Sequence, residues 1–412
     1  MSLSAAGASL VGMVSWVLAA RVLTPTQLGT AAAFVSATLL VAGCTDLNLG
    51  IGLMRWLPRA GGAARVLVLR GAGTVAGLAG LVALVYVLLP HSSLVVDAAA
   101  GPDGDRAVAA GLFVLTAMLY AVFQQQDFVL VGLGRPWWAP SRIGLFAVAR
   151  LAVLLGLGAT LTTVGVVWSW LLPTAGAVVL AAVVVAQTLS RSPGNTEPWV
   201  PHRRDVVAFL GPTYSGKIAT AVLYNQVPLV VTFRFGPEVG ASFFLVWQAI
   251  TVIDVVALYF VAPLSSGIAR APERADELAR ATRRRLLLLL LPPIALGAAI
   301  SGPLLGLFGG PYRAAAPVLA LMLLGCAARL LVIHRLGEHQ ARGRAVRYAR
   351  LAVVNTVFVL GVALLAPPAS TSVPGLLLPV AAGFVVVQVL CAGAVLLRRR
   401  YETPIAPAAS GS

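Results

Sequence analysis

Residues 376–400 read LLLPVAAGFVVVQVLCAGAVLLRRR. The stretch carries no charged residue from Leu376 to Leu397 and then ends in three consecutive arginines. The hydrocarbon core of a bilayer is about 30 Å thick, so a helix that crosses it needs about 20 mainly apolar residues. The stretch therefore predicts a membrane-spanning helix with a basic end at the membrane surface.

The rest of the chain repeats this pattern. Of its 412 residues, 59% are hydrophobic and 11% are charged, and the mean hydropathy is +0.92. Soluble globular chains carry about 25% charged residues, and disordered chains are poor in apolar ones. Both classes are thereby excluded, and we expect an all-α polytopic membrane protein of about twelve transmembrane helices. The predicted spans are 3–20, 29–53, 66–90, 107–133, 143–163, 164–189, 206–233, 240–265, 286–308, 315–333, 351–366 and 376–397.

The short loops between these spans predict an orientation. Arginines gather in every second loop, whereas the alternate loops hold only Arg21, Arg106, Arg234 and Arg313. Basic residues mark the cytoplasmic ends of membrane helices. We therefore expect a multi-pass protein of the cytoplasmic membrane with both termini in the cytoplasm. Because the net charge of +16 is spread over these loops, we expect membrane lipid and no nucleic acid among its partners.

One polar inner connection, RSPGNTEPWVPHRRD, spans residues 191–205 and divides the chain. It separates an N-terminal six-helix lobe (1–190) from a C-terminal six-helix lobe (206–397), which a cytoplasmic tail (398–412) follows. Both lobes begin at the cytoplasmic face, so a repeat would be parallel. The segments ARVLTPTQLGTAAAF and TFRFGPEVGASFF echo one another at equivalent positions, with an arginine, a proline and a glycine in the same order. The echo indicates two pseudo-symmetric bundles.

Three segments resemble the polysaccharide flippases of the multidrug/oligosaccharidyl-lipid/polysaccharide (MOP) exporter superfamily. They are a first hairpin, a later Leu-Phe-Gly segment and a basic inner loop. The matching positions are Ala20, Arg21, Leu23, Pro25, Gly29, Asp46, Leu47 and Gly50, then Leu307, Phe308, Gly309, Tyr312 and Ala315, and finally Ala341, Gly343 and Arg344.

The resemblance implies a V-shaped flippase whose two lobes rock about a central cavity. It implies translocation of a polyprenyl-diphosphate-linked oligosaccharide or polysaccharide precursor from the inner to the outer leaflet. The partners that it implies are the lipid-linked glycan itself and the glycan polymerase and glycosyltransferases of the same pathway. It also implies that Arg21 faces the cavity, and the repeat extends this role to Arg234.

Lys217 is the first candidate for binding an anionic head group, because a charged side chain inside the bilayer is costly and marks a functional site. It lies about 16 Å into its span at a rise of 1.5 Å per residue. It shares a helix face with Tyr224 and Asn225, which we expect to line a cavity. A structural ion pair with Asp254 is the alternative.

Two arginines are further candidates for the anion site. Arg329 lies near the middle of its span with no acidic neighbour along its own helix, and its alternative role is to bond helix-end carbonyls. Arg150 lies closer to the inner end of its span, from where its side chain can reach the interface. With Lys217, they predict a net basic cavity.

Three carboxylates lie within predicted spans, and we expect them to couple transport to H⁺ or Na⁺. Asp254 is near the middle of the membrane and either carries a coupling ion or pairs with Lys217. Asp46 and Asp127 lie toward the inner ends of their spans. Asp127 ends a polar stripe with Thr116, Tyr120 and Gln124, which lines a cavity or bonds neighbouring helices.

Several function classes find no support in the sequence. There is no glycine-rich phosphate loop followed by Lys-Ser/Thr, and the histidines and cysteines show no metal-ligand spacing. We therefore expect no ATP hydrolysis, no cofactor and no metal centre, and we do not expect an enzyme. The alternatives to a flippase are an ion-coupled multidrug exporter of the same superfamily, a membrane glycan polymerase or ligase, and a non-transporting scaffold.

Overall fold

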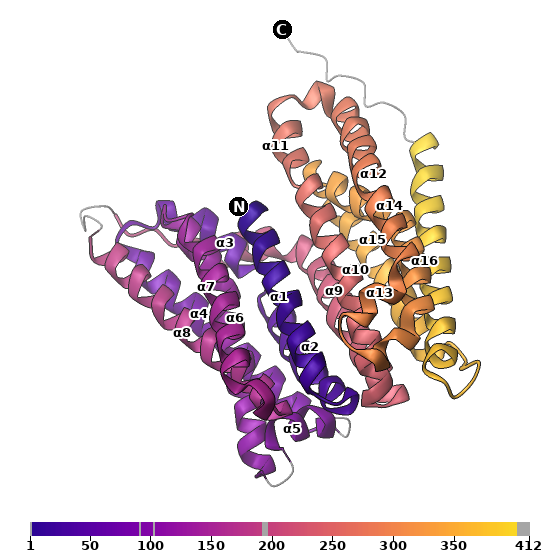
Figure 1. Cartoon of the computed structure of the whole chain (residues 1–412). Helices are drawn as coiled ribbons and strands as arrows, with labels where there is room; N and C mark the ends of the chain where they lie inside the picture. Colours follow the sequence, from indigo (N-terminus) through magenta and orange to yellow (C-terminus); the bar gives the residue numbers. More distant parts are fainter. Residues whose placement is uncertain (1, 90–91, 102–103, 192–196, 402–412) are drawn as a thin grey trace. The chain divides into compact units, whose positions relative to one another are not determined.

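The computed structural model describes residues 2–89, 92–101, 104–191 and 197–401, and every element in these ranges is a helix (Figure 1). Residues 192–196 of the predicted linker and 402–412 of the predicted tail lie outside the described residues. The helices form two compact units, Met1–Phe244 and Leu245–Ser412, which we call unit 1 and unit 2.

Unit 1 contains nine helices of eight residues or more in its described part, and a tenth begins in it. They are α1 (Ser2–Val22), α2 (Pro25–Thr45), α3 (Leu49–Trp56), α4 (Ala64–Val87), α5 (Ser93–Ala100), α6 (Arg106–Gly132), α7 (Trp138–Leu157), α8 (Thr163–Ser190), α9 (Arg203–Phe235) and the first residues of α10 (Pro237–Val261). Short 3₁₀ turns connect some of them, such as η4 (Gly158–Thr160) between α7 and α8.

Unit 2 contains the rest of α10 and the remaining helices of the chain. They are α11 (Pro263–Arg270), α12 (Ala275–Ala299), α13 (Ser301–Gly306), α14 (Ala316–Ala341), α15 (Ala345–Leu365) and α16 (Val373–Tyr401), with the 3₁₀ helices η5 (Pro272–Arg274) and η6 (Gly310–Ala315). Helix α14 is the centre of this unit, since it packs against α16, α12, α11 and α15.

The predicted fold class is confirmed. Each predicted span overlaps one long helix of the described chain, and the spans 29–53, 240–265 and 286–308 also run into a short helix that follows it. Ten helical segments have both the length and the hydropathy to cross a membrane. Helix α12 is not among them, because its first half carries four arginines (Arg280, Arg283, Arg284 and Arg285). The protein is therefore a multi-pass membrane protein.

The boundary between the compact units does not coincide with the predicted linker. It falls between Phe244 and Leu245, inside α10. Helix α9 belongs to unit 1, because it packs along α2 over much of its length. The division into lobes 1–190 and 206–397 stays a prediction.

The predicted span 29–53 is broken, and the break sets the position of Asp46. Helix α2 begins with a capping box in which Thr24 and Gln27 bond each other's backbone N–H groups, and Pro25 opens the first turn. It ends at Thr45, and Leu47 and Asn48 then adopt φ values of 51° and 57°. Side chains rarely adopt this left-handed conformation, so tertiary packing holds it. Asp46 consequently lies at a helix end.

The helices differ in how much surface they bury within the structure. In the most apolar window of α2, 72% of the residues are buried, whereas the corresponding window that starts in α7 is only 17% buried. The exposed residues of α4 and α7 include many leucines and valines, such as Leu69, Leu84, Leu145 and Leu155. Extended apolar surface of this kind suits contact with lipid, so α2 is a core helix and α7 faces the bilayer on one side.

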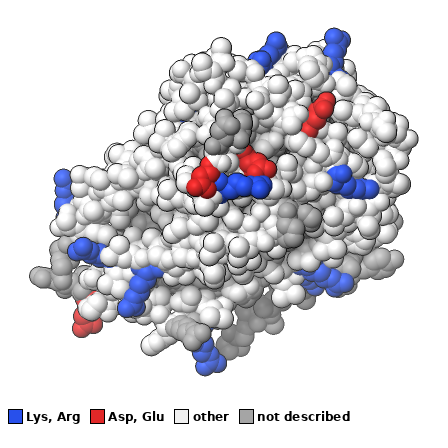
Figure 2. Space-filling view, turned by 90° about the horizontal axis from the view of Figure 1, so that it is seen from below, with Lys and Arg blue, Asp and Glu red and all other residues white. Residues whose placement is uncertain are grey.

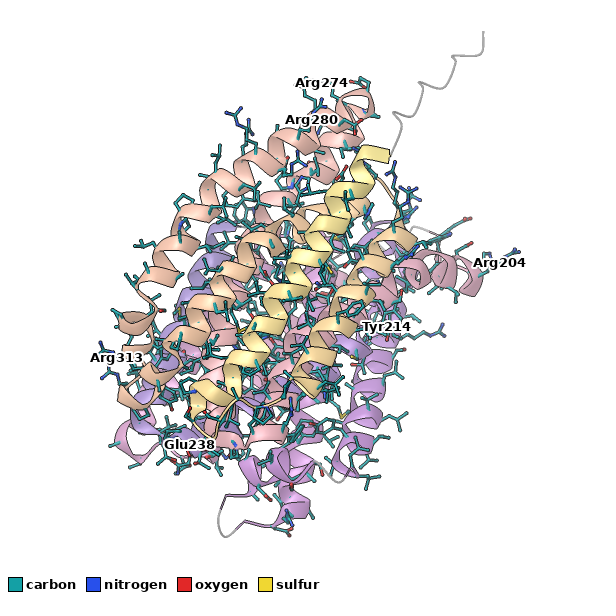
Figure 3. All side chains as sticks on the ribbon, turned by 90° about the vertical axis from the view of Figure 1, so that its right-hand side faces the viewer. Arg204, Tyr214, Glu238, Arg274, Arg280 and Arg313 are labelled. Atoms are coloured by element: carbon teal, nitrogen blue, oxygen red, sulfur yellow. The ribbon has the colours of Figure 1, made fainter. Side chains whose placement is uncertain are left out.

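Exposed arginines of unit 2 lie at its two ends, apart from the buried pair of Arg329 and Asp254. Figure 3 shows Arg274 and Arg280 at one end and Arg313 at the other, as the predicted inner and outer loops require. On the face shown in Figure 2 most of the described surface is uncharged, and acidic and basic side chains adjoin one another near its centre. The side of the membrane that each end faces stays a prediction.

Candidate functional site

Asp46 and Lys217 form the first of three ion pairs that neutralise the carboxylates of the predicted spans. The Lys217 Nζ donates to Asp46 Oδ2, which joins α9 to the end of α2. The Asp46 side chain is only 2% exposed, whereas that of Lys217 is 31% exposed. One turn earlier on α9, the Tyr214 hydroxyl donates to the carbonyl oxygen of Cys44. The end of α2 is thus held to α9 by a charged and a neutral contact.

The second ion pair lies inside unit 2. Arg329 on α14 donates from Nε to Asp254 Oδ2 on α10 at 2.7 Å, and both side chains are buried. Arg329 also donates from Nη1 to Asn355 Oδ1 on α15 at 3.1 Å. Asn355 in turn donates to Gln388 Oε1 on α16 at 3.3 Å. Four helices are therefore joined through one buried polar chain.

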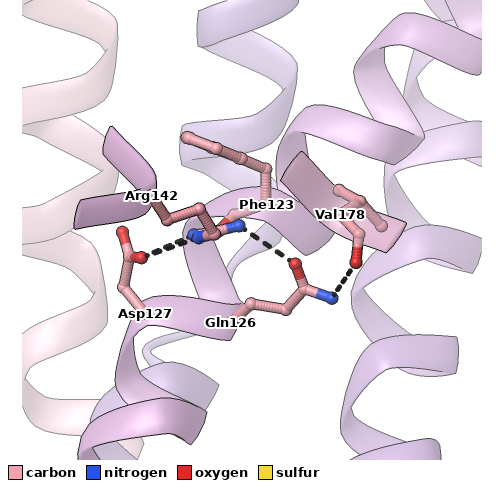
Figure 4. Close-up of polar contacts among 5 residues, drawn as sticks. All are labelled: Phe123, Gln126, Asp127, Arg142 and Val178. Carbon is pink, nitrogen blue, oxygen red and sulfur yellow. Dashed lines mark hydrogen bonds and ion pairs between the residues drawn. The ribbon is translucent and has the colours of Figure 1, made fainter. Parts of the chain in front are cut away.

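The third ion pair centres on Arg142, near the start of α7 (Figure 4). Its guanidinium donates from Nε to Asp127 Oδ1 at 3.2 Å and from Nη1 to Gln126 Oε1 at 3.0 Å, both on α6. It also donates from Nη2 to the carbonyl oxygen of Phe123 and lies 4.0 Å from the centre of that ring. Gln126 donates to the carbonyl oxygen of Val178 on α8 at 3.1 Å. Arg142 is 1% exposed, so the cluster ties three helices together from within.

Arg150 differs from these three cations, because no carboxylate among the described residues pairs with it. It is 4% exposed, and its Nε and Nη2 atoms are buried without a hydrogen-bond partner. Its Cζ lies 4.6 Å from the centre of the Trp170 ring on α8 and 5.0 Å from that of the Trp16 ring on α1. Arg150 is thus a buried cation whose neighbours are aromatic.

The remaining predicted substrate-binding residues are more exposed or hydrogen-bonded locally. Arg21 is exposed in the last turn of α1, and Arg234 is half-buried at the end of α9, where its guanidinium lies 4.7 Å from the Phe235 ring. Asn225 donates to the carbonyl oxygen of Ala221 one turn earlier at 2.9 Å. Tyr224 is half-buried.

The structure corrects the predicted pairing of Lys217 with Asp254. Lys217 pairs with Asp46, and Asp254 pairs with Arg329. Two further predictions change with it. Arg329 has an acidic partner on a neighbouring helix, although none lies along its own. Arg150 does not extend to a polar interface, since its side chain is buried among aromatic rings.

Sequence reasoning missed Arg142, which it interpreted as a topology signal in an inner loop. The available signal was the run of three glutamines and one aspartate at 124–127, which needs a polar partner inside a membrane. Asn355 and Gln388 were missed as well, although each interrupts an apolar span. Among the described residues, no group of three or more His, Cys, Asp or Glu is placed to hold a metal ion.

The charge balance of the spans follows from these contacts. Asp46, Asp127 and Asp254 are the only carboxylates within the predicted spans, and each has a basic partner. Arg150 is left as an excess buried positive charge. The interior of the described helices is therefore better suited to an anion than to a cation.

Solved structures with the same arrangement of helices belong to membrane transporters. An inward-facing multidrug resistance MATE family transporter of the MOP superfamily superposes with a TM-score of 0.71 at 14% identity, covering 96% of this chain and 95% of that chain. The chain has the fold of a MOP-superfamily transporter. The lipid II flippase MurJ, in an inward closed conformation, has a TM-score of 0.69 at 12% identity, with 97% and 87% covered.

A variant of the Vibrio cholerae MATE transporter VcmN has this fold as well. It superposes with a TM-score of 0.62 at 15% identity, and the match covers 97% of this chain and 98% of that chain. No family model and no curated protein matches the sequence significantly. The likeness therefore concerns the fold. Both multidrug transporters and a lipid flippase share it, so the substrate has to be argued from the side chains.

Proposed function

We propose that the protein is an alternating-access flippase that moves a polyprenyl-diphosphate-linked saccharide across the cytoplasmic membrane. The observation that carries the proposal is the charge balance of the spans, in which three carboxylates are neutralised and Arg150 remains. A diphosphate offers several anionic oxygens to such a cation. The MOP fold, which the lipid II flippase MurJ shares, supports this class of substrate.

In the proposed cycle the anionic head group enters from the cytoplasmic side while the polyprenyl tail stays in the bilayer. Buried cations hold the diphosphate, and a change of conformation then opens the site to the outside. The membrane potential favours outward movement of an anion by about 2.3 kcal/mol per charge per 100 mV, since the cell interior is negative. The step breaks no covalent bond, so we propose a transporter that is not an enzyme and needs no cofactor.

Coupling to H⁺ or Na⁺ enters the proposal through the ion pairs. Protonation of Asp46 or Asp254, or Na⁺ binding to either, would weaken its contact with Lys217 or Arg329. The freed cation would then be available to the diphosphate. The partners in this scheme are membrane lipid, the lipid-linked glycan, and the polymerase and glycosyltransferases that use or make it.

The proposal is tested by flipping in proteoliposomes. A fluorescent polyprenyl-diphosphate oligosaccharide is loaded into both leaflets, and its accessibility to a membrane-impermeant glycosidase is followed over time. We expect protein-dependent exposure of the inner pool, which an inside-negative potential accelerates. Absence of exposure under every ion gradient, with a known flippase active in parallel, would refute a flippase.

A multidrug exporter is the second candidate, since MATE multidrug transporters share the fold. Efflux of a cationic dye from the same vesicles, driven by a proton or sodium gradient, would favour it. Elongation of the glycan by the purified protein would instead favour the polymerase alternative. Because Arg150 leaves the interior with an excess positive charge, we expect neither efflux of the cationic dye nor elongation of the glycan.

A further inference from the structure

Arg150 occupies a site built from four helices of unit 1. It lies three turns into α7, about 18 Å from the start of the helix at 1.5 Å per residue. Trp16 of α1 and Trp170 of α8 both face its guanidinium. Tyr120 of α6 packs on Trp170 with ring centres 5.7 Å apart, and Phe146 packs on the same ring at 5.8 Å. Aromatic rings thus fix the guanidinium in place.

The aromatic rings satisfy only part of this cation. The face of an indole attracts the positive charge of a guanidinium, but it offers no acceptor to the N–H groups at the guanidinium's edge. The Nε and Nη2 atoms of Arg150 are buried and have no hydrogen-bond partner. Arg142 and Arg329, which are buried to a similar degree, use their Nε atoms to bond carboxylates.

The identity of the two unpartnered atoms indicates the ligand. The Nε and Nη2 hydrogens point to the same side of a guanidinium and form a fork of two parallel donors. A carboxylate or a phosphate group accepts both through two oxygens. All three carboxylates of the predicted spans are paired elsewhere, and no described residue places an acceptor at these two atoms, so an anionic group of a bound molecule fits this position.

We propose that Arg150, framed by Trp16 and Trp170, is the subsite that binds a phosphate group of a lipid-linked ligand. The inference rests on the proposed function and names its head-group site: two phosphate oxygens accept from Nε and Nη2. A phospholipid head group has the same chemistry, and the test distinguishes the two sources. Lys217 and Arg329 are held in ion pairs in this structure, so Arg150 is the cation that receives the anion first.

Binding is measured by tryptophan fluorescence of the purified full chain, because two tryptophans adjoin the site. The probe is farnesyl diphosphate, with farnesol, inorganic pyrophosphate and phosphatidylglycerol micelles as comparison ligands. We expect a saturable change with farnesyl diphosphate that Arg150→Gln weakens at least tenfold. Trp170→Phe keeps an aromatic face but should reduce the signal. The exposed Arg106 provides the matched control, and Arg106→Gln should bind as the wild type does.

The Arg150→Lys variant tests whether binding needs the two parallel donors of the guanidinium or only its positive charge. It keeps a cation beside the rings but presents no pair of parallel donors, so we expect severalfold weaker binding. If Arg150→Gln fails to fold, as judged by its melting temperature, Arg150→Lys carries the test. Equal affinity of folded Arg150→Gln or Arg150→Lys and wild type would overturn the inference. So would the absence of a saturable response to every phosphate ligand.

The comparison ligands and the flipping assay complete the test. A phosphatidylglycerol response as strong as that to farnesyl diphosphate would overturn the substrate subsite in favour of a phospholipid site. Flipping that continues in Arg150→Gln would refute the subsite and leave the flippase standing. Binding that depends on Arg150, without any flipping by wild type, would refute the flippase and leave the phosphate site standing.

Discussion

Lys217 on α9 forms an ion pair with Asp46, a residue 171 positions away that directly follows α2. The pair lies where the backbone of Leu47 and Asn48 breaks the helical path. Its carboxylate is buried and its ammonium is partly exposed. If the pair opens, the ammonium can turn toward its exposed side, whereas the carboxylate stays buried without its cation.

A double-mutant cycle tests this pair. Lys217→Gln leaves a buried carboxylate without its cation, so we expect it to lower stability more than Asp46→Asn/Lys217→Gln does. The loss should stay below the about 3–5 kcal/mol typical of breaking a fully buried pair, because Lys217 is partly exposed. Melting temperatures of the four purified proteins provide the measurement. Strictly additive effects would mean that the two groups do not interact.

The close approach of α2 to α9 and to the first residue of α10 depends on glycines. A Cβ atom at Gly43 would lie 2.8 Å from the Cβ of Ala221, and one at Gly29 would collide with the backbone of Pro237. We expect both Gly29→Ala and Gly43→Ala to destabilise the protein, because neither the Pro237 backbone nor the Ala221 Cβ can move without shifting its helix. Gly29→Ala should cost more, because its overlap is deeper. Thermal melting of the purified variants measures both.

Gly73 on α4 provides the control for these glycines. Nothing lies within 4 Å of a Cβ atom placed there, and the residue is exposed. Gly73→Ala should therefore be neutral or stabilise the helix by up to about 1 kcal/mol. Equal losses for Gly29→Ala and Gly73→Ala would show that helix packing is not the cause.

The spans could be predicted from the sequence, whereas the contacts between them could not. Apolar run length is a local property, and the boundary that it predicts between residues 163 and 164 lies next to Thr162, whose side chain caps α8. The acidic partner of Arg329 lies 75 positions away, and that of Lys217 lies 171 away. No spacing rule reaches that far, because helix packing decides which faces meet. For the same reason, the aromatic surroundings of Arg150 emerged only from the fold.

A comparison of Arg142 with Arg135 tests whether Arg142 stabilises the fold or only marks the membrane orientation as a basic loop residue. Both were predicted to be inner-loop arginines, but Arg142 is buried in the cluster with Asp127 and Gln126, whereas Arg135 is exposed. Arg142→Gln should cost about 3–5 kcal/mol because it leaves Asp127 unpaired. Arg135→Gln should change stability by less than about 0.5 kcal/mol. Equal melting temperatures of the two variants would contradict the structural role of Arg142.

The predicted orientation is tested by single cysteines at the two ends of unit 2, in a background without the native cysteines Cys44, Cys326 and Cys391. Arg274 and Arg313 lie at opposite ends of the unit and are both exposed (Figure 3). The positive-inside rule places Arg274, which a cluster of arginines follows on α12, in the cytoplasm. A membrane-impermeant maleimide should therefore label Arg313→Cys in intact cells and Arg274→Cys only after permeabilisation. The reverse pattern would show that the predicted membrane orientation is inverted.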